Sequence, residues 1–180
     1  ALCVADAAAM VEQARAASVP IFAAHTYLWH PKFETLAQAA DEALAQGERR
    51  LLIGTLGFGT HTHEDCSTWW DYGSHDAAMV LWCFRRSGPP VQVSGGHFGD
   101  SNCLRPVFAT GAAQLYFGTA SQRIRCAVLS GDDLSIRFVD AERDGNPLNR
   151  MLDEFVAALD GGPVDARFDP AFAIEVVRVL

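Results

Sequence analysis

The feature that most limits the fold is a change in the spacing of apolar residues along the chain. Apolar side chains recur at helical intervals near both ends, whereas residues 50–139 hold several short runs typical of strands, with one apolar helix at 72–84 among them. A run of strands with helices around it predicts an α+β domain. We therefore expect one largely antiparallel, open-faced sheet with helices packed on one face.

The strands are expected at 50–58, 91–97, 107–110, 113–119, 122–129 and 134–139. In the first of them, Leu52, Leu56 and Phe58 share one face. The last two flank a Gly-Asp-Asp turn and predict an antiparallel hairpin. The side chains expected to point inward in this hairpin are Ile124, Cys126, Val128, Leu134, Ile136 and Phe138.

The remaining helices are expected from Asp6 to about Ala17, from Pro31 to a stop at Gly47, over 148–159, and over 170–180 after the N-cap Asp169. A short buried strand is expected over 19–24. Together with the first helix, this strand is half of a βαβ unit. The first 25 residues are thus expected to form part of a βαβ unit, which differs from the antiparallel sheet that follows.

Composition excludes several classes of protein. Hydrophobic residues make up 49% of the 180 and charged residues 20%, which is normal for a globular protein and wrong for a disordered one. The net charge of −8 disfavours nucleic acid and anionic membrane as partners. No apolar run approaches the ~20 residues of a membrane helix, and no signal peptide opens the sequence. The five cysteines are odd in number and never spaced CxxC, so we expect reduced thiols in a cytoplasmic protein.

The densest group of polar residues lies between residues 61 and 76. Asp71 and His75 are four apart, which places them on one face of a helix. An aspartate there can orient an imidazole or stabilise its charged form, an arrangement suited to general acid/base chemistry. The alternative is that Asp71 is only the N-cap of the helix and His75 a histidine without a catalytic role.

A metal site is a second interpretation of this group. His61 and His63 are two apart after a strand and would point the same way, as in metal-dependent hydrolases, with Glu64, Asp65 and Cys66 as further ligands. A solvated loop explains the same residues, and a catalytic zinc site normally has three protein ligands.

Other chemistry-bearing residues carry weaker signals. The outward arginines Arg123, Arg125 and Arg137 would form one basic stripe or simply a solvated or subunit-facing side of the sheet. Trp69 and Trp70 directly precede Asp71 and would wall a cleft. The sequence contains neither GxGxxG nor GxxxxGK[ST], so it carries neither of the phosphate-binding glycine loops.

The segment Trp69-Trp70-Asp71-Tyr72-Gly73-Ser74-His75-Asp76 resembles the D-x-G-x-H signature of the Gfo/Idh/MocA family of NAD(P)-dependent oxidoreductases. Three further stretches are similar to that family and follow its order along the chain. They are the opening helix with Ser18-Val-Pro-Ile-Phe22, the segment His25-Thr-Tyr-Leu-Trp-His-Pro31, and the closing pair of helices. The resemblance covers essentially the whole chain.

The resemblance implies two parts in the chain. Residues 1–25 would be the end of a truncated Rossmann-type domain, the tail of a βαβ unit. Residues 26–180 would be the C-terminal substrate-binding and dimerisation domain, whose open sheet face builds a homo-oligomer. In such enzymes a hydride passes between a nicotinamide cofactor and a carbon of a sugar, cyclitol or related polyol.

The resemblance also assigns roles. His75 would be the acid/base group, and Asp71 would bind and orient the substrate. The substrate-binding candidates are His25, Tyr27, His30, Trp70 and His97. NAD or NADP would be bound mainly by a part of the enzyme absent from this chain.

The chain departs from the family in three ways. It has no cofactor fingerprint, its only lysine, Lys32, does not match the catalytic lysine of the E-K-P motif, and Leu28 stands where arginine is common. On these grounds we expect the 180 residues alone to be inactive. Two alternatives stay open: a non-catalytic binding or scaffold module of the same fold, and a metal-dependent hydrolase using His61 and His63.

Overall fold

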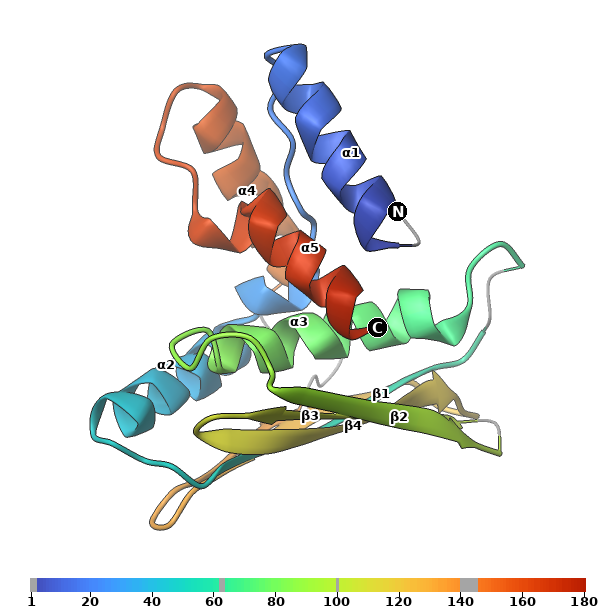
Figure 1. Cartoon of the computed structure of the whole chain (residues 1–180), viewed down its shortest axis with the longest axis vertical. Helices are drawn as coiled ribbons and strands as arrows, with labels where there is room; N and C mark the ends of the chain where they lie inside the picture. Colours follow the sequence, from blue (N-terminus) through green and yellow to red (C-terminus); the bar gives the residue numbers. More distant parts are fainter. Residues whose placement is uncertain (1–2, 62–63, 100, 140–145) are drawn as a thin grey trace.

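The sheet and the helices form separate layers. The computed structural model describes residues 3–61, 64–99, 101–139 and 146–180. Every helix of the described chain lies on the same side of a six-stranded sheet, with α2 (Pro31–Ala45) and α3 (Ser74–Cys83) directly above it (Figure 1). The α+β architecture predicted from the apolar spacing is confirmed.

The α-helices that pack farther from the sheet are α1 (Val4–Ala16), α4 (Pro147–Leu159) and α5 (Pro170–Val179). Three short turns complete the helical layer: η1 (Thr26–Trp29), η2 (Trp69–Gly73) and η3 (Ala166–Phe168). Of these, η2 lies against the sheet, where Trp69 packs on Phe117 of a central strand with ring centroids 5.0 Å apart. Proline opens α2, α4 and α5, where its missing N–H costs no hydrogen bond. Asp169 caps α5 as predicted, through an Oδ1 that accepts from the Ala171 N–H at 2.9 Å. Asp6 is not the cap of α1, because the Cys3 sulfur accepts the Asp6 N–H instead.

The strand β1 lies inside the sheet, whose order is β2-β3-β4-β1-β5-β6. The strands are β1 (Leu51–Gly59), β2 (Gln92–Phe98), β3 (Ser101–Phe108), β4 (Gly111–Thr119), β5 (Ile124–Ser130) and β6 (Ser135–Val139). β1 runs parallel to β4 and antiparallel to β5, and the other pairs are antiparallel. The predicted hairpin of the last two strands is confirmed.

The two faces of the sheet differ in what covers them. On β1, Leu51, Ile53 and Thr55 are buried under the helices, while Leu52 and Leu56 are exposed on the opposite, uncovered face. The predicted alternation is therefore present, and Leu52 and Leu56 do share a face, but that face is the open one.

The prediction for β5 was wrong about which side is covered. Ile124 and Val128 are exposed on the open face, whereas Arg125 and Leu129 are buried on the helix side. Alternation shows that a strand has two faces, and hydrophobicity alone predicts that the more apolar face is covered. That prediction fails for β5 because Arg125 pairs with the buried carboxylate of Asp76 on the helix side. Arg137 pairs with Val128 on the open face, so the three arginines form no common stripe.

The strand expected over 19–24 is not formed. These residues have irregular backbone, and Val19 is 57% exposed. A strand needs a neighbouring strand for its backbone hydrogen bonds. Within the described residues the amide of Ala23 finds only the carbonyl of Phe168, which lies outside the sheet.

The α4 helix follows its predicted pattern, yet much of its apolar stripe is exposed. Met151 is buried and Phe155 packs on the edge of the core. The exposed members of the stripe are Leu148, Leu152, Val156 and Leu159. Helical periodicity thus predicts where the helix lies, but it does not show how many of its apolar side chains are buried against the rest of the chain.

The core fills the space between the helices and the sheet. Its largest fully buried side chains include Trp29, Phe33, Phe84, Phe117, Phe138 and Phe168. Phe84, just after α3, stacks on Phe108 of β3 with ring centroids 4.1 Å apart. All five cysteines are free thiols. No helix of the described residues is long and apolar enough to cross a membrane.

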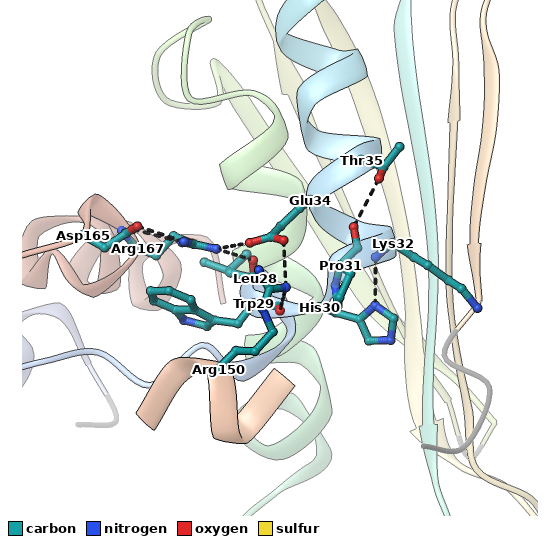
Figure 2. Close-up of polar contacts among 10 residues, drawn as sticks. All are labelled: Leu28, Trp29, His30, Pro31, Lys32, Glu34, Thr35, Arg150, Asp165 and Arg167. Carbon is teal, nitrogen blue, oxygen red and sulfur yellow. Dashed lines mark hydrogen bonds and ion pairs between the residues drawn. The ribbon is translucent and has the colours of Figure 1, made fainter. Parts of the chain in front are cut away.

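A carboxylate on α2 ties the outer helices to the inner layer (Figure 2). Glu34 binds Arg150 of α4 at 2.8 Å and Arg167 of η3 at 2.6 Å. Both arginines also donate to backbone carbonyls of η1, and Arg167 lies 3.5 Å from the centroid of the Trp29 ring. Three segments far apart in the sequence therefore meet at one side chain.

We expect Glu34→Ala to lower the free energy of unfolding by about 1–2 kcal/mol, because two partly buried guanidiniums lose their common partner. Glu12→Ala removes an exposed pair with Arg15 on α1 and should cost about 0.5 kcal/mol or less. Urea unfolding of the two variants measures the difference. Equal losses would show that the Glu34 contacts are as weak as an ordinary surface pair.

Candidate functional site

A cavity of about 250 Å³ lies where the helix layer meets the ends of β1 and β5. Four separate segments supply its walls. The lining residues are Tyr27, Phe58, Gly59, Thr60, His61, Asp71, Tyr72, His75, Arg123 and Arg125. The spacing of Asp71 and His75 predicts that they share a helix face. Both line this cavity, together with Tyr27.

The turn that carries Asp71 is a π-helical turn, η2, which runs directly into α3. Such turns are frequent at functional sites because they re-aim side chains within a helix. The caps of η2 and α3 are Thr68 and Gly73, so the alternative in which Asp71 is an N-cap does not hold.

His75 is held as a neutral imidazole. Burial is the main cause that lowers its pKa to about 3, and the positive charges of Arg125, of His25 once it is protonated, and of Arg123 act in the same direction. Its Nδ1 is buried without a hydrogen-bond partner among the described residues. A neutral imidazole with an unoccupied ring nitrogen can accept a proton from a bound hydroxyl group.

A buried ion pair lies beside the cavity. Arg125 of β5 donates to the carboxylate of Asp76, and both side chains are almost completely buried. Burial raises the pKa of Asp76 to about 6, and the adjacent guanidinium opposes that rise, so the carboxyl group is ionised at neutral pH. The pair joins the sheet to the first turn of α3.

Two tyrosines shape the opening of the cavity. The Tyr27 and His75 rings contact edge to face, with their centroids 5.2 Å apart. The guanidinium carbon of Arg125 lies over the face of the Tyr27 ring, 4.4 Å from its centroid. The Tyr27 hydroxyl oxygen accepts a hydrogen bond from Arg123. Tyr72 donates to the His61 carbonyl, and burial raises the pKa of its hydroxyl group.

A second, apolar cavity of about 280 Å³ lies on the other side of the π-turn. Trp70 and Ser74 line it, while Asp71 and His75, one residue later in each case, line the first. His25 also lines the apolar cavity, and burial lowers its pKa to about 4. Three of the predicted substrate-binding residues are thus divided between two cavities, with Tyr27 in the first and His25 and Trp70 in the second.

Two of the predicted substrate-binding residues lie elsewhere. His30 is completely buried against Phe138, and its Nδ1 accepts the Lys32 N–H at 3.2 Å as the cap of α2. His97 is exposed on the edge strand β2, where its ring meets Trp69 at 5.9 Å. Neither residue lines the cavity that contains His75.

The metal interpretation stays a hypothesis. His61 lines the cavity, whereas His63 lies outside the described residues. Within the part of the chain that is described, no three His, Cys, Asp or Glu side chains converge as metal ligands would.

Sequence reasoning missed the contributions of Arg123, Arg125 and Tyr72 to the cavity. The alternation of β5 predicts that Arg125 lies on the outer face, because a charged residue in an alternating strand is usually exposed. The signal that could have located it is Asp76, an acidic residue in the first turn of an otherwise apolar helix, since a buried carboxylate requires a partner.

Solved structures share this fold, although no protein-family model matches the sequence and no curated protein matches it. A Magnetospirillum magnetotacticum MS-1 protein described as an oxidoreductase has a TM-score of 0.75 at 20% identity, over 99% of this chain and 67% of its own. The UDP-N-acetylglucosamine 3-dehydrogenase GnnA from Acidithiobacillus ferrooxidans has a TM-score of 0.72 at 18% identity, over 98% and 64%. GenD2 from gentamicin A biosynthesis, in complex with NAD, has a TM-score of 0.77 at 15% identity, over 99% and 64%. The chain has the fold that this part of these solved structures shares. It spans about two thirds of the length of these proteins.

We expect the chain to lose stability between pH 6.5 and 4. His25 and His75 have pKa values of about 4 and 3 when folded, whereas an exposed histidine of the unfolded chain has its ordinary pKa of about 6.5, so acid favours the unfolded state. The raised pKa of Asp76 works in the opposite direction over the same range, because the folded state binds that proton more tightly. The net loss at pH 5 relative to pH 7 should be about 2 kcal/mol in urea unfolding.

The matched variants are His25→Gln/His75→Gln, which should abolish the loss, and His97→Gln, which removes an exposed imidazole and should leave it in place. If the unfolding free energy of the natural chain is equal at pH 5 and pH 7, the two histidines are not held neutral by burial.

Proposed function

We propose that this chain is the substrate-binding and oligomerisation portion of a Gfo/Idh/MocA-type oxidoreductase acting on a sugar, cyclitol or related polyol. The observation that carries the proposal is the convergence of Asp71 and His75 in one cavity of a chain with an oxidoreductase fold. The site residues that we propose as catalytic are these two.

The chemistry assigned to the site is the removal of two hydrogens from a secondary alcohol. The bound cofactor would supply the hydride acceptor. His75, neutral at physiological pH, takes the hydroxyl proton as the carbon–oxygen double bond forms, and returns it in the reverse direction. Asp71 accepts a hydrogen bond from the substrate and orients it toward the imidazole. Tyr27 forms the wall that limits where the ring of the substrate can lie.

The cofactor would be NAD or NADP. The sequence has no glycine-rich loop for a pyrophosphate, and the described cavity residues include no such cradle, so we propose that residues outside this chain bind most of it. GenD2 was solved in complex with NAD, which supports a nicotinamide cofactor.

The substrate class is supported by the cavity and by one relative. Its volume of about 250 Å³ lies below the ~300 Å³ at which drug-sized pockets begin, and its lining mixes aromatic rings with hydroxyl, imidazole and charged groups. Such a site suits a compact, hydroxyl-rich molecule. GnnA, of similar fold, is a UDP-N-acetylglucosamine 3-dehydrogenase.

We further propose that residues 1–25 belong with a Rossmann-type domain and 26–180 with the substrate domain. Support comes from α1, which has no buried residue, and from the apolar segment after it, which lacks a strand partner among the described residues. Both features are typical of an αβ half-unit that completes a sheet elsewhere.

The proposed oligomer is a homo-oligomer formed through the open face of the sheet. Six apolar side chains there are 36–55% exposed, on a face that no described helix covers. They are Leu52, Leu56, Val107, Ile124, Val128 and Val139. A second copy of the same face would bury them.

His75→Gln is expected to lower the turnover of the protein that carries this chain with its nicotinamide-binding domain by about 100-fold or more, because the proton acceptor is lost. NADH formation with a panel of cyclitols and sugars measures it. Asp153→Asn, an exposed carboxylate on α4, is the control and should leave turnover unchanged. Full turnover in a folded His75→Gln protein would remove His75 from the mechanism.

Leu52→Arg/Val128→Arg is expected to convert the oligomer to a monomer, because two charges would be buried unpaired in the interface. Sedimentation velocity measures the change. Leu148→Arg/Leu152→Arg, which alters equally exposed apolar residues on α4, should leave the oligomer intact. A monomeric natural chain at tens of micromolar would contradict the proposal.

A further inference from the structure

We propose that Arg125 is a positioning residue for His75, and that Asp76 and Gly57 hold its guanidinium in place. The positions of these residues are part of the folded structure. Only the role of His75 as a proton acceptor rests on the proposed function.

The guanidinium is tethered to the same turn of helix that carries the imidazole. Asp76 directly follows His75 at the start of α3, and its Oδ1 accepts a hydrogen bond from Arg125 Nη1. The two side chains are 0% and 4% exposed. A movement of α3 relative to β5 would therefore break a buried ion pair, which fixes the distance between the imidazole and the sheet.

Gly57 provides the space for this pair. It is the cross-strand partner of Arg125 in the β1–β5 ladder. A Cβ at this position would lie 2.1 Å from Asp76 Oδ2 and 2.8 Å from Arg125 Nη1, which is too close for either contact. The carboxylate and the guanidinium thus meet over a strand position where only glycine leaves room.

Tyr27 lies between the guanidinium and the imidazole and contacts both. Its ring lies under Arg125, 4.4 Å from the guanidinium carbon to the ring centroid, and meets His75 at 76° with centroids 5.2 Å apart. Cation–π attraction holds the ring in this orientation. Arg125, Tyr27 and His75 therefore form a continuous row from the sheet to the cavity.

A buried ion pair is weak evidence for added stability. Apolar residues of similar size often replace buried ion pairs with no loss, since both charges must give up their hydration. The position of the pair next to the cavity is explained if the pair serves to hold the Arg125 guanidinium and the Tyr27 ring in fixed positions beside His75.

The charges around His75 act together with this row. His25 and Tyr27 face it from the segment before α2, Asp71 and Tyr72 from η2, and Arg123 and Arg125 from the β5 side. Burial is the largest cause that holds the imidazole neutral, and the two guanidiniums act in the same direction. Arg125 is the cation fixed by burial, so its removal should favour protonation of His75.

The test is a histidine NMR titration of the 180-residue chain, which does not depend on catalysis. In the natural chain, His75 should remain neutral down to about pH 5, and nuclear Overhauser contacts should join the Tyr27 and His75 rings. In Asp76→Asn/Arg125→Gln, where both charges are removed together, the His75 midpoint should rise by about one unit or more. The contacts between the rings should weaken in the same variant.

The matched control is Asp41→Asn/Arg85→Gln. Arg85 likewise pairs with an aspartate and lies 4.5 Å from the centroid of a tryptophan ring, but just beyond the C-terminal end of α3, the end opposite His75. It should leave His75 unchanged. Arg125→Lys keeps the charge without the planar stacking, so the ring contacts should weaken while the midpoint moves less.

A folded Asp76→Asn/Arg125→Gln chain with the midpoint and ring contacts of the natural protein would overturn the proposal. If that variant does not fold, Gly57→Ala replaces it, with Gly54→Ala as control because a Cβ at Gly54 meets no atom within 4 Å. Unchanged His75 signals in a folded Gly57→Ala chain would equally overturn it. A shifted midpoint in a protein without dehydrogenase activity would contradict the proposed function and leave this inference standing.

Discussion

The contact between Asp76 and Arg125 is the constraint on which the cavity depends. It joins the first turn of α3 to the sheet at the point where β1 contributes no side chain. The π-turn before α3 then sends Trp70 and Ser74 to one side and Asp71 and His75 to the other. The polar cavity therefore lies between the helix and the sheet, whereas the apolar one lies away from the sheet, against α1 and α5.

Much of the fold could be predicted because it follows from spacing and caps. Pro31, Asp169 and the glycine after α2 set helix ends, and the alternation of β5 and β6 around a turn set the hairpin. These are local signals, each contained within a few residues. The pair Asp71 and His75 was found in the same way, since four residues are one turn of helix.

What sequence could not provide depends on contacts between distant segments. Arg125 can be buried because it pairs with Asp76, and no pattern within β5 reveals a partner that lies 49 residues away in the chain. The irregular backbone at 19–24 has the same origin, because an apolar run becomes a strand only beside another strand. The exposed stripe of α4 and the open face of the sheet show that apolar residues mark surfaces suited to burial, whether or not this chain covers them.

The position of β1 has a consequence for the synthesis of the protein. Both neighbours of this strand, β4 and β5, lie after it in the sequence, and its first parallel partner is 60 residues downstream, as Leu51 pairs with Gly111. As the chain leaves the ribosome, β1 is therefore an apolar segment whose backbone hydrogen bonds stay unmet until residues 111–130 emerge. Pairings of such long sequence separation form slowly, and unpaired apolar strands are prone to aggregate. This interval is where a nascent chain of this fold would most need a chaperone.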